Sequence, residues 1–311
     1  MSISSFAQIP SYIPKDSLVG WWPFNGNAND ESGNGNNGTV YNSSLTTNKN
    51  GTPNSAYQFS NSADYIKTSA KPQNITKLSI SLWFITSNGG YFINQGQHEG
   101  GPHLGMHNSF TGGAIHNGKI FFYQSNSAGG FGTMTDSVYN DNKWHSLIAV
   151  LNGYNTSSLS PDSMKIYIDG RRVKYSTVNT VSGSFPKSPS SSISIAYGTD
   201  PNSNYIGNID DVGIWSRALD FDEVKSIYSG TNSSANLNND YSESRIKYFP
   251  NPVNDILNIQ GVHTISNYQI TNAIGQTVML GKLTEKIDVS ALNSGMYLLI
   301  TETGTLRFTK E

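Results

Sequence analysis

The feature that most constrains the fold is an alternation of apolar and polar residues with a period of two, repeated along residues 18–230. The clearest run is Leu-Ser-Ile-Ser-Leu-Trp-Phe at residues 78–84, the pattern of a strand with one face buried. Glycine and asparagine clusters separate such runs, and Asp169-Gly170 supplies the dipeptide of a tight type I′ hairpin. The pattern therefore predicts many short antiparallel strands joined by turns.

Only one segment of the chain is typical of a helix. Asp220 stands at the N-cap position, Glu223 follows three residues later to complete a capping box, and Gly230 stands where a helix commonly ends. Many short strands and one late helix predict an all-β fold, a two-sheet jelly-roll sandwich, over residues 18–230.

The composition excludes several classes of protein. Charged residues make up 14% of the 311 residues, the formal net charge is -2, and the basic residues are scattered, so the sequence lacks the electrostatic footprint of a nucleic-acid-binding protein. The absence of cysteine excludes disulfides, thiolate metal sites and a cysteine nucleophile. No apolar run reaches 18 residues, so we expect no membrane-spanning segment.

The last fifth of the chain carries four short patterns in a fixed order. They are the proline-rich run Tyr248-Phe249-Pro250-Asn251-Pro252, a hairpin with Gly275 at its turn, Asp288-Val289-Ser290-Ala291-Leu292 followed by Gly295-Met296-Tyr297, and a terminal Lys310.

This succession resembles the type A C-terminal sorting domain of the type IX secretion system and predicts a small C-terminal β-sandwich at residues 248–311. The resemblance implies that the type IX secretion machinery is a partner and that the chain is secreted or attached to the outer-membrane surface. A sorting domain of this family directs export and performs no chemistry, so we expect the function in the residues before 248.

Residues 18–230 carry a second set of ordered patterns. They include Trp21-Trp22, the loop Gly33-Asn34-Gly35-Asn36-Asn37-Gly38, Trp144-His145, and Ile209-Asp210-Asp211-Val212-Gly213-Ile214-Trp215. This set resembles the laminin-G-like, concanavalin A-like lectin domain. We therefore divide the chain into a signal-peptide remnant and leader (1–17), this domain (18–230), a polar linker (231–247) and the sorting domain (248–311).

The sequence predicts an oxygen-ligated cation. Asn25 and Asp30 stand in a loop rich in asparagine and glycine, which suits the six to eight oxygen ligands of calcium. By strand parity Asp210 shares a face with Val212 and Ile214, so we expect its carboxylate to be buried and in need of a partner. The resemblance implies a structural Ca²⁺ joining these regions, with Asn25, Asp30 and Asp210 as ligands. In the alternative, Asp30 only shapes a turn and Asp210 only accepts backbone hydrogen bonds.

Known catalytic patterns are missing. No strand carries the two glutamates of a jelly-roll glycoside hydrolase, and no G-x-S-x-G turn occurs. His98-Glu99 begins like a zinc motif, but Pro102 replaces the second histidine. We therefore expect no catalytic residues and no enzyme.

The remaining hypothesis is binding. Tyr91, Tyr123 and Phe131 could stack on a sugar, and His103 could contact a ligand, although core packing is the alternative for each aromatic residue. The sequence thus predicts an exported, calcium-stabilised binding module for a glycan or a surface or matrix protein. Its rivals are a polysaccharide hydrolase or lyase with an unrecognised site, and a passive structural or adhesion module without a small ligand.

Overall fold

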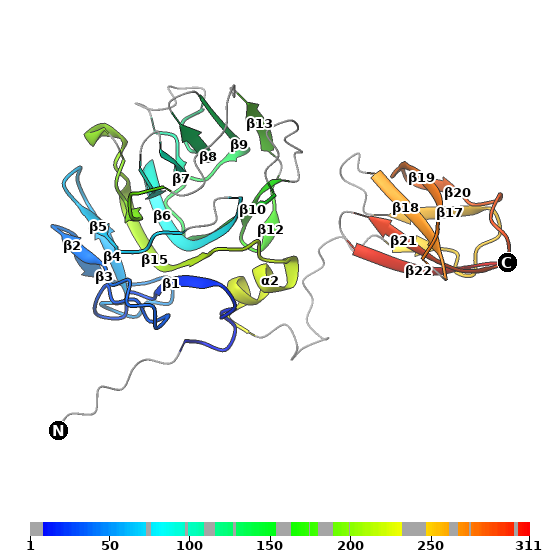
Figure 1. Ribbon diagram of the computed structural model, residues 1–311, viewed down its shortest axis with the longest axis horizontal. Helices are drawn as coiled ribbons and strands as arrows, with labels where there is room; N and C mark the ends of the chain where they lie inside the picture. The colour runs from blue at the N-terminus through cyan, green and yellow to red at the C-terminus, as the bar shows by residue number, and fades with distance from the viewer. Residues whose placement is uncertain are drawn as a thin grey trace. The chain divides into compact units, whose positions relative to one another are not determined.

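The computed structural model divides the chain into two compact units, residues 1–237 and 238–311 (Figure 1). The structure describes residues 9–311 except 73–75, 97–98, 109–115, 127–128, 154–162, 174, 180–188, 199, 232–246, 261–266, 274 and 302–303. The first eight residues of the predicted signal-peptide remnant and leader, and most of the predicted linker, lie outside the described residues.

The larger unit is a two-layered antiparallel sandwich, as the alternation predicted, and the long strand β6 (Lys77–Asn94) belongs to both layers. The first layer contains β12 (Arg171–Arg172), β11 (Met164–Ile168), β10 (His145–Asn152), the first half of β6 and β15 (Ile206–Trp215), with β1 (Leu18–Trp22), β4 (Ala56–Phe59) and β3 (Ser44–Thr46) beyond β15. The second layer runs in the order β2 (Thr39–Tyr41), β5 (Tyr65–Lys67), β14 (Ser194–Ile195), the second half of β6, β7 (Glu99–Met106), β8 (Lys119–Asn126), β9 (Gly129–Val138) and β13 (Tyr175–Asn179).

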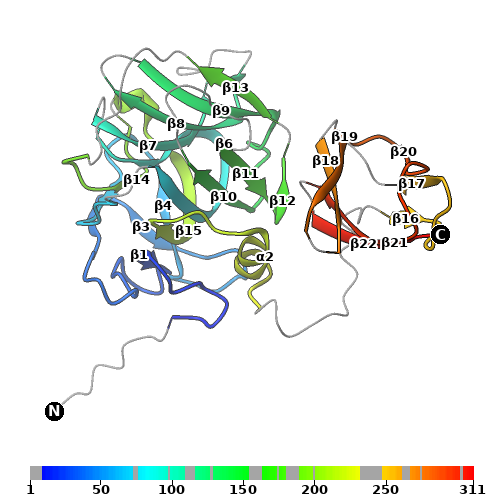
Figure 2. The same cartoon turned by 45° about the vertical axis from the view of Figure 1, so that its right-hand side comes forward.

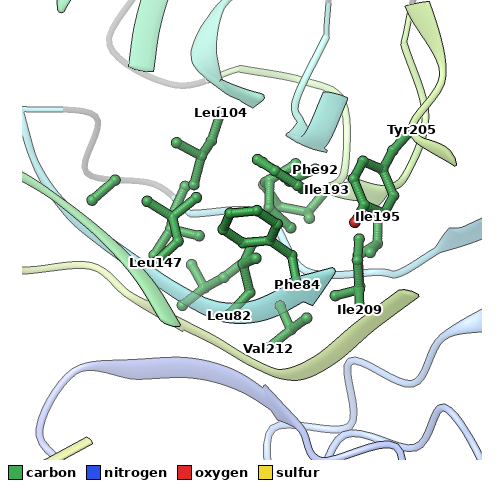
Figure 3. Packing of buried hydrophobic residues seen from close by; sticks show 14 of the residues in the cluster. Leu82, Phe84, Phe92, Leu104, Leu147, Ile193, Ile195, Tyr205, Ile209 and Val212 are labelled. Carbon is green, nitrogen blue, oxygen red and sulfur yellow. The ribbon is translucent and has the colours of Figure 1, made fainter. Parts of the chain in front are cut away.

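The main core lies between these two layers. Figure 3 shows Leu82 and Phe84 of β6 and Val212 of β15 facing Leu104 of β7 across the interior. All four side chains are at most 1% exposed. Each buried side chain of this size contributes roughly 1.5–3 kcal/mol to stability, so the core is what holds the layers together.

A second cluster covers the outer face of the first layer. The helix α2 (Phe221–Ser229) begins at the N-cap Asp220 with the predicted capping box and ends at Gly230 in the left-handed conformation, so that prediction is confirmed. Its Val224 packs with Trp21 of β1 in this cluster, and Figure 2 shows α2 beside β15.

The segment just before β1 also belongs to this cluster. Ile13 is 1% exposed, and Trp215 donates its indole N–H to the carbonyl of Pro14 at 2.7 Å. Residues 9–17, which we expected to be leader, are therefore part of the folded sandwich.

The smaller unit consists of two antiparallel sheets around its own core. One contains β16 (Lys247–Phe249), β17 (Ile256–Gln260) and β20 (Lys286–Asp288); the other contains β19 (Thr277–Lys282), β18 (Asn267–Asn272), β21 (Gly295–Thr301) and β22 (Gly304–Lys310). Leu257, Ile270, Leu299 and Phe308 are buried between them.

Among the described residues of the chain, no helix has the length and apolar character needed to span a bilayer.

Candidate functional site

Asp30 lies in the loop after β1, and both of its carboxylate oxygens accept hydrogen bonds from backbone N–H groups. Its Oδ1 accepts the N–H groups of Trp21 at 3.0 Å and Ser32 at 2.9 Å, and its Oδ2 accepts the N–H of Asn36 at 2.8 Å. Charge-assisted bonds of this kind are stronger than neutral ones, so they fix the loop along the edge of β1. Asn25 is exposed, and the described residues show no hydrogen bond from it to Asp30 or Asp210.

Asp210 lies on the opposite face from the one that strand parity predicted. It pairs with Trp83 of β6, whose neighbours Leu82 and Phe84 belong to the main core, so Asp210 shares the outer face with Trp83. The pairing of β15 with β6 shifts between Asp210 and Gly213, and Asp211 adopts a φ of 50°. This bulge adds one residue, which reverses the faces on either side of it.

A lysine ammonium lies beside the buried Asp210 carboxyl group. Lys49 Nζ is 2.6 Å from Asp211 Oδ2, 3.8 Å from Asp210 Oδ2, and 4.8 Å from the centroid of the Trp83 ring. Asp210 is 1% exposed, and its Oδ1 accepts the N–H of Asp211 at 2.9 Å. Burial, followed by the negative charge of Asp211, raises the pKa of Asp210 to about 8, while Lys49 acts in the opposite direction.

These contacts do not fit a calcium ion held jointly by Asp30 and Asp210. Both Asp30 oxygens already accept backbone donors, and the cation beside Asp210 is Lys49. Within the described part of the chain, no group of three or more histidine or acidic side chains could hold a metal ion. The contacts instead support the alternative in which Asp30 shapes its loop.

Chelation tests the sequence-based calcium prediction directly. Because both Asp30 oxygens accept backbone N–H groups and the Lys49 ammonium lies 3.8 Å from Asp210 Oδ2, we expect excess EDTA to leave the thermal midpoint of the full-length protein unchanged. Differential scanning calorimetry with and without EDTA, followed by elemental analysis, is the measurement. A midpoint that falls in EDTA and returns with Ca²⁺ would restore the prediction, because a cation present at a thousand times its dissociation constant adds about 4 kcal/mol.

The outer face of the second layer carries a continuous set of aromatic and polar side chains. Strand pairing aligns Asn94 of β6 with His103 of β7, and His103 with Tyr123 of β8. In the next row, Tyr91 aligns with Gly105, and Gly105 with Phe121. The intervening Leu104 and Phe122 belong to the core, so these two rows face outward. We call the set Tyr91, Asn94, His103, Phe121 and Tyr123 the aromatic face.

Glycines let the rings of the aromatic face lie against the sheet. A Cβ atom at Gly105 would lie 2.6 Å from Phe121 Cζ, and one at Gly132 would lie 2.5 Å from Tyr123 Cδ1. The two rings therefore cross glycines on the neighbouring strands β7 and β9, where any other side chain would displace them.

The rings of the aromatic face also contact one another. The Tyr91 ring centroid lies 5.2 Å from that of Phe121 and 6.1 Å from that of His103, and the Phe121 centroid lies 5.6 Å from that of Tyr123. Phe121 is 3% exposed, whereas Tyr91 and Tyr123 are half-buried. Phe121 thus supports the two tyrosines from within the cluster, and burial raises the pKa of both tyrosines.

The structure brings together three of the four predicted ligand residues. Tyr91, His103 and Tyr123 share the aromatic face, whereas Phe131 of β9 pairs with Gln124 and is buried in the main core at 1% exposure. The core-packing alternative therefore applies to Phe131. Sequence reasoning missed Phe121, although its alternation with the core residue Phe122 could have placed it beside Tyr123.

Comparison with protein families identifies both units. The model of the family described as the concanavalin A-like lectin/glucanases superfamily matches residues 60–225, more than half of the chain. The chain therefore belongs to this superfamily. Residues 247–311 match the secretion system C-terminal sorting domain, so the chain is exported by type IX secretion to the cell surface or the medium.

Solved structures show the same fold at low sequence identity. The receptor binding domain of botulinum neurotoxin C/D mosaic serotype is similar with a TM-score of 0.51 and 18% identity, covering 94% of this chain and 73% of that one. The botulinum neurotoxin serotype D ligand binding domain in complex with N-acetylneuraminic acid gives 0.50 and 17%, covering 92% and 71%. None of the curated proteins matches the chain.

Proposed function

We propose that the exported sandwich is a binding module and that its aromatic face binds a glycan. The observation that carries the proposal is the position of Tyr91 and Tyr123, half-buried on the outer face of a sheet and supported by Phe121. Sugars are commonly held by aromatic rings against their apolar side and by polar groups that bond their hydroxyls. The phenol hydroxyls of Tyr91 and Tyr123 supply such polar groups, whereas Asn94 and His103 are only 4% and 5% exposed.

The chemistry of these side chains favours binding over catalysis. The aromatic face contains a histidine, an amide, two phenols and a phenyl ring, and none of its five members is a carboxylic acid. Hydrolysis of a glycosidic bond by the usual mechanism needs two carboxyl groups flanking that bond. We therefore assign to this surface the recognition of a saccharide rather than its cleavage.

A glycan array tests the proposal on the full-length protein. We expect the wild type to bind a defined set of glycans and Tyr123→Ala to bind them at least tenfold more weakly, a loss of about 1.4 kcal/mol. Tyr268→Ala is a matched control, because Tyr268 is a half-buried tyrosine of the sorting unit, and it should leave binding unchanged.

Two results on the array would contradict the proposal. Either no glycan binds, or Tyr123→Ala binds as the wild type does while keeping its thermal midpoint. New reducing ends released from a bound polysaccharide would instead identify a hydrolase.

A further inference from the structure

Three tyrosines surround one lysine near the β2 end of the second layer. Lys67 Nζ lies 6.0 Å from the ring centroid of Tyr41, 5.7 Å from that of Tyr65 and 5.8 Å from that of Tyr197. The Tyr41 and Tyr65 rings are stacked at 4.4 Å, and the Tyr65 and Tyr197 centroids are 4.8 Å apart. We call these four residues the lysine-tyrosine cluster.

The cluster lies on the same side of the sheet as the aromatic face. Ile66, between Tyr65 and Lys67, is buried in the main core, so its two neighbours face outward. Strand pairing then aligns Lys67 with Ser194, Ser194 with Asn94, and Asn94 with His103. Asn94 and His103 are 4% and 5% exposed, so the member of the aromatic face that a ligand can contact in this row is the half-buried Tyr123, which pairs with His103. With strands about 4.8 Å apart, Lys67 lies about 19 Å from Tyr123 along this row. A single extended ligand can therefore contact both places.

The positive charge of Lys67 is not neutralised by the protein in the part of the chain that the structure describes. Lys67 is exposed, and among the described residues its ammonium contacts the three tyrosine rings and no carboxylate. Lys225 of α2 differs in this respect, because it lies 4.7 Å from the Phe221 centroid but also 2.9 Å from the carboxylate of Asp222. Lys67 thus presents an ammonium group held by aromatic rings and open to an external anion.

We propose that the lysine-tyrosine cluster binds the anionic group of an acidic saccharide, a carboxylate or a sulfate, whose chain continues onto the aromatic face. The proposal rests on the proposed function and names its ligand class. Cation–π contacts hold the ammonium in place before the ligand arrives, which lowers the ordering cost of binding. The tyrosine rings present apolar surface to the sugar ring, and Lys67 selects the saccharide that carries a negative charge.

Titration calorimetry of the full-length protein tests this selection with three probes. These are an oligogalacturonate, which carries carboxylates, a sulfated oligogalactan, and a neutral oligogalactan of the same length. We expect the wild type to bind at least one acidic probe at least tenfold more tightly than the neutral one, and added salt to reduce the difference.

Substitutions then assign the selection to Lys67. We expect Lys67→Gln to lose the preference for the acidic probe, and Lys67→Arg to keep it because the charge remains. The matched control is Lys225→Gln, which removes a ring-contacting lysine already paired with Asp222 and should bind as the wild type does. Thermal midpoints of the variants show whether each remains folded.

Failure of this inference is distinguishable from failure of the proposed function. An acidic probe bound equally by the wild type and by folded Lys67→Gln overturns the role of the cluster, as does the absence of binding to both acidic probes. If the neutral probe or an array glycan still binds and Tyr123→Ala removes that binding, the proposed function stands without the inference. If no saccharide binds at all, both fail.

Discussion

A chain ending at residue 246 is expected to keep its sandwich folded and to lose export. The two units are compact, each has its own hydrophobic core, and residues 247–311 match the sorting domain as a whole. Deletion therefore removes the export signal without removing any core residue of the sandwich. Export is measured in a bacterium that carries the type IX machinery, by comparing the protein in the medium and on the cell surface with the protein inside the cell.

Two controls distinguish loss of the export signal from misfolding of the truncated protein. The truncated protein, purified from the cell, should melt cooperatively at the midpoint of the sandwich in the intact chain. The full chain with Tyr123→Ala should still be exported, because Tyr123 belongs to the aromatic face and not to the sorting unit. Normal secretion of the truncated chain would contradict the assignment of residues 247–311 as the export signal.

The replacement Asp210→Asn is expected to remove a pH dependence of stability. Burial raises the folded-state pKa of Asp210 from its usual value near 4 to about 8, so the folded protein holds a proton that the unfolded chain releases. Between those values the free energy of unfolding falls as the pH rises, by at most about 1.4 kcal/mol per pH unit. Asparagine keeps the acceptor for the Asp211 N–H and cannot ionise.

Chemical denaturation at several pH values between 5 and 8, in EDTA, measures this slope. His145, whose pKa is raised first of all by its hydrogen bond to Asp169, adds a slope of the same sign, so the difference between wild type and Asp210→Asn is the decisive quantity. Asp222→Asn is the control, because Asp222 is an exposed acid on α2. An Asp210→Asn protein with an unchanged slope, or with lower stability than the wild type at pH 8, would contradict this account of Asp210.

Local sequence signals predicted the regular elements well. The capping box at Asp220 and Glu223 satisfies its own backbone donors, so the helix start needs no information from elsewhere in the chain. Asp169 and Gly170 adopt φ values of 52° and 74°, as the predicted type I′ hairpin requires, and Ile168 pairs with Arg171 across it. Alternation likewise predicted the core-facing sides of β6 and β11. The expectation that only one face of residues 78–84 is buried was wrong, because Ser79 and Ser81 on the other face are 0% and 1% exposed.

The alternation of strand faces gave the wrong prediction for Asp210, because the backbone departs from a regular strand there. The bulge at Asp210–Asp211 adds one residue to β15, so Asp210 lies on the outer face. The residue types in this run do not indicate a bulge. The partner of Asp210 could not be predicted either, because Lys49 lies 161 positions earlier in the chain and reaches it only through the folding of an exposed loop.

The candidate binding surface depends on strand order, which one sequence does not reveal. Tyr91 and Tyr123 could be proposed from their residue type, but only the pairing of β6, β7 and β8 shows that they share a face. The lysine-tyrosine cluster combines residues from β2, β5 and the segment after β14, far apart in the chain. Its members alternate with buried residues, which could have indicated that they face outward but not that they meet.

Nuclear magnetic resonance can show whether a glycan binds to the outer face of the second layer. The full-length protein would carry labelled tyrosine rings and be titrated with the tightest-binding array glycan. We expect the ring signals of Tyr91 and Tyr123 to shift, while those of Tyr167, buried beneath α2, and Tyr297, in the sorting unit, stay in place. Shifts confined to Tyr167 or Tyr297, with Tyr91 and Tyr123 unchanged at saturation, would contradict binding at this face.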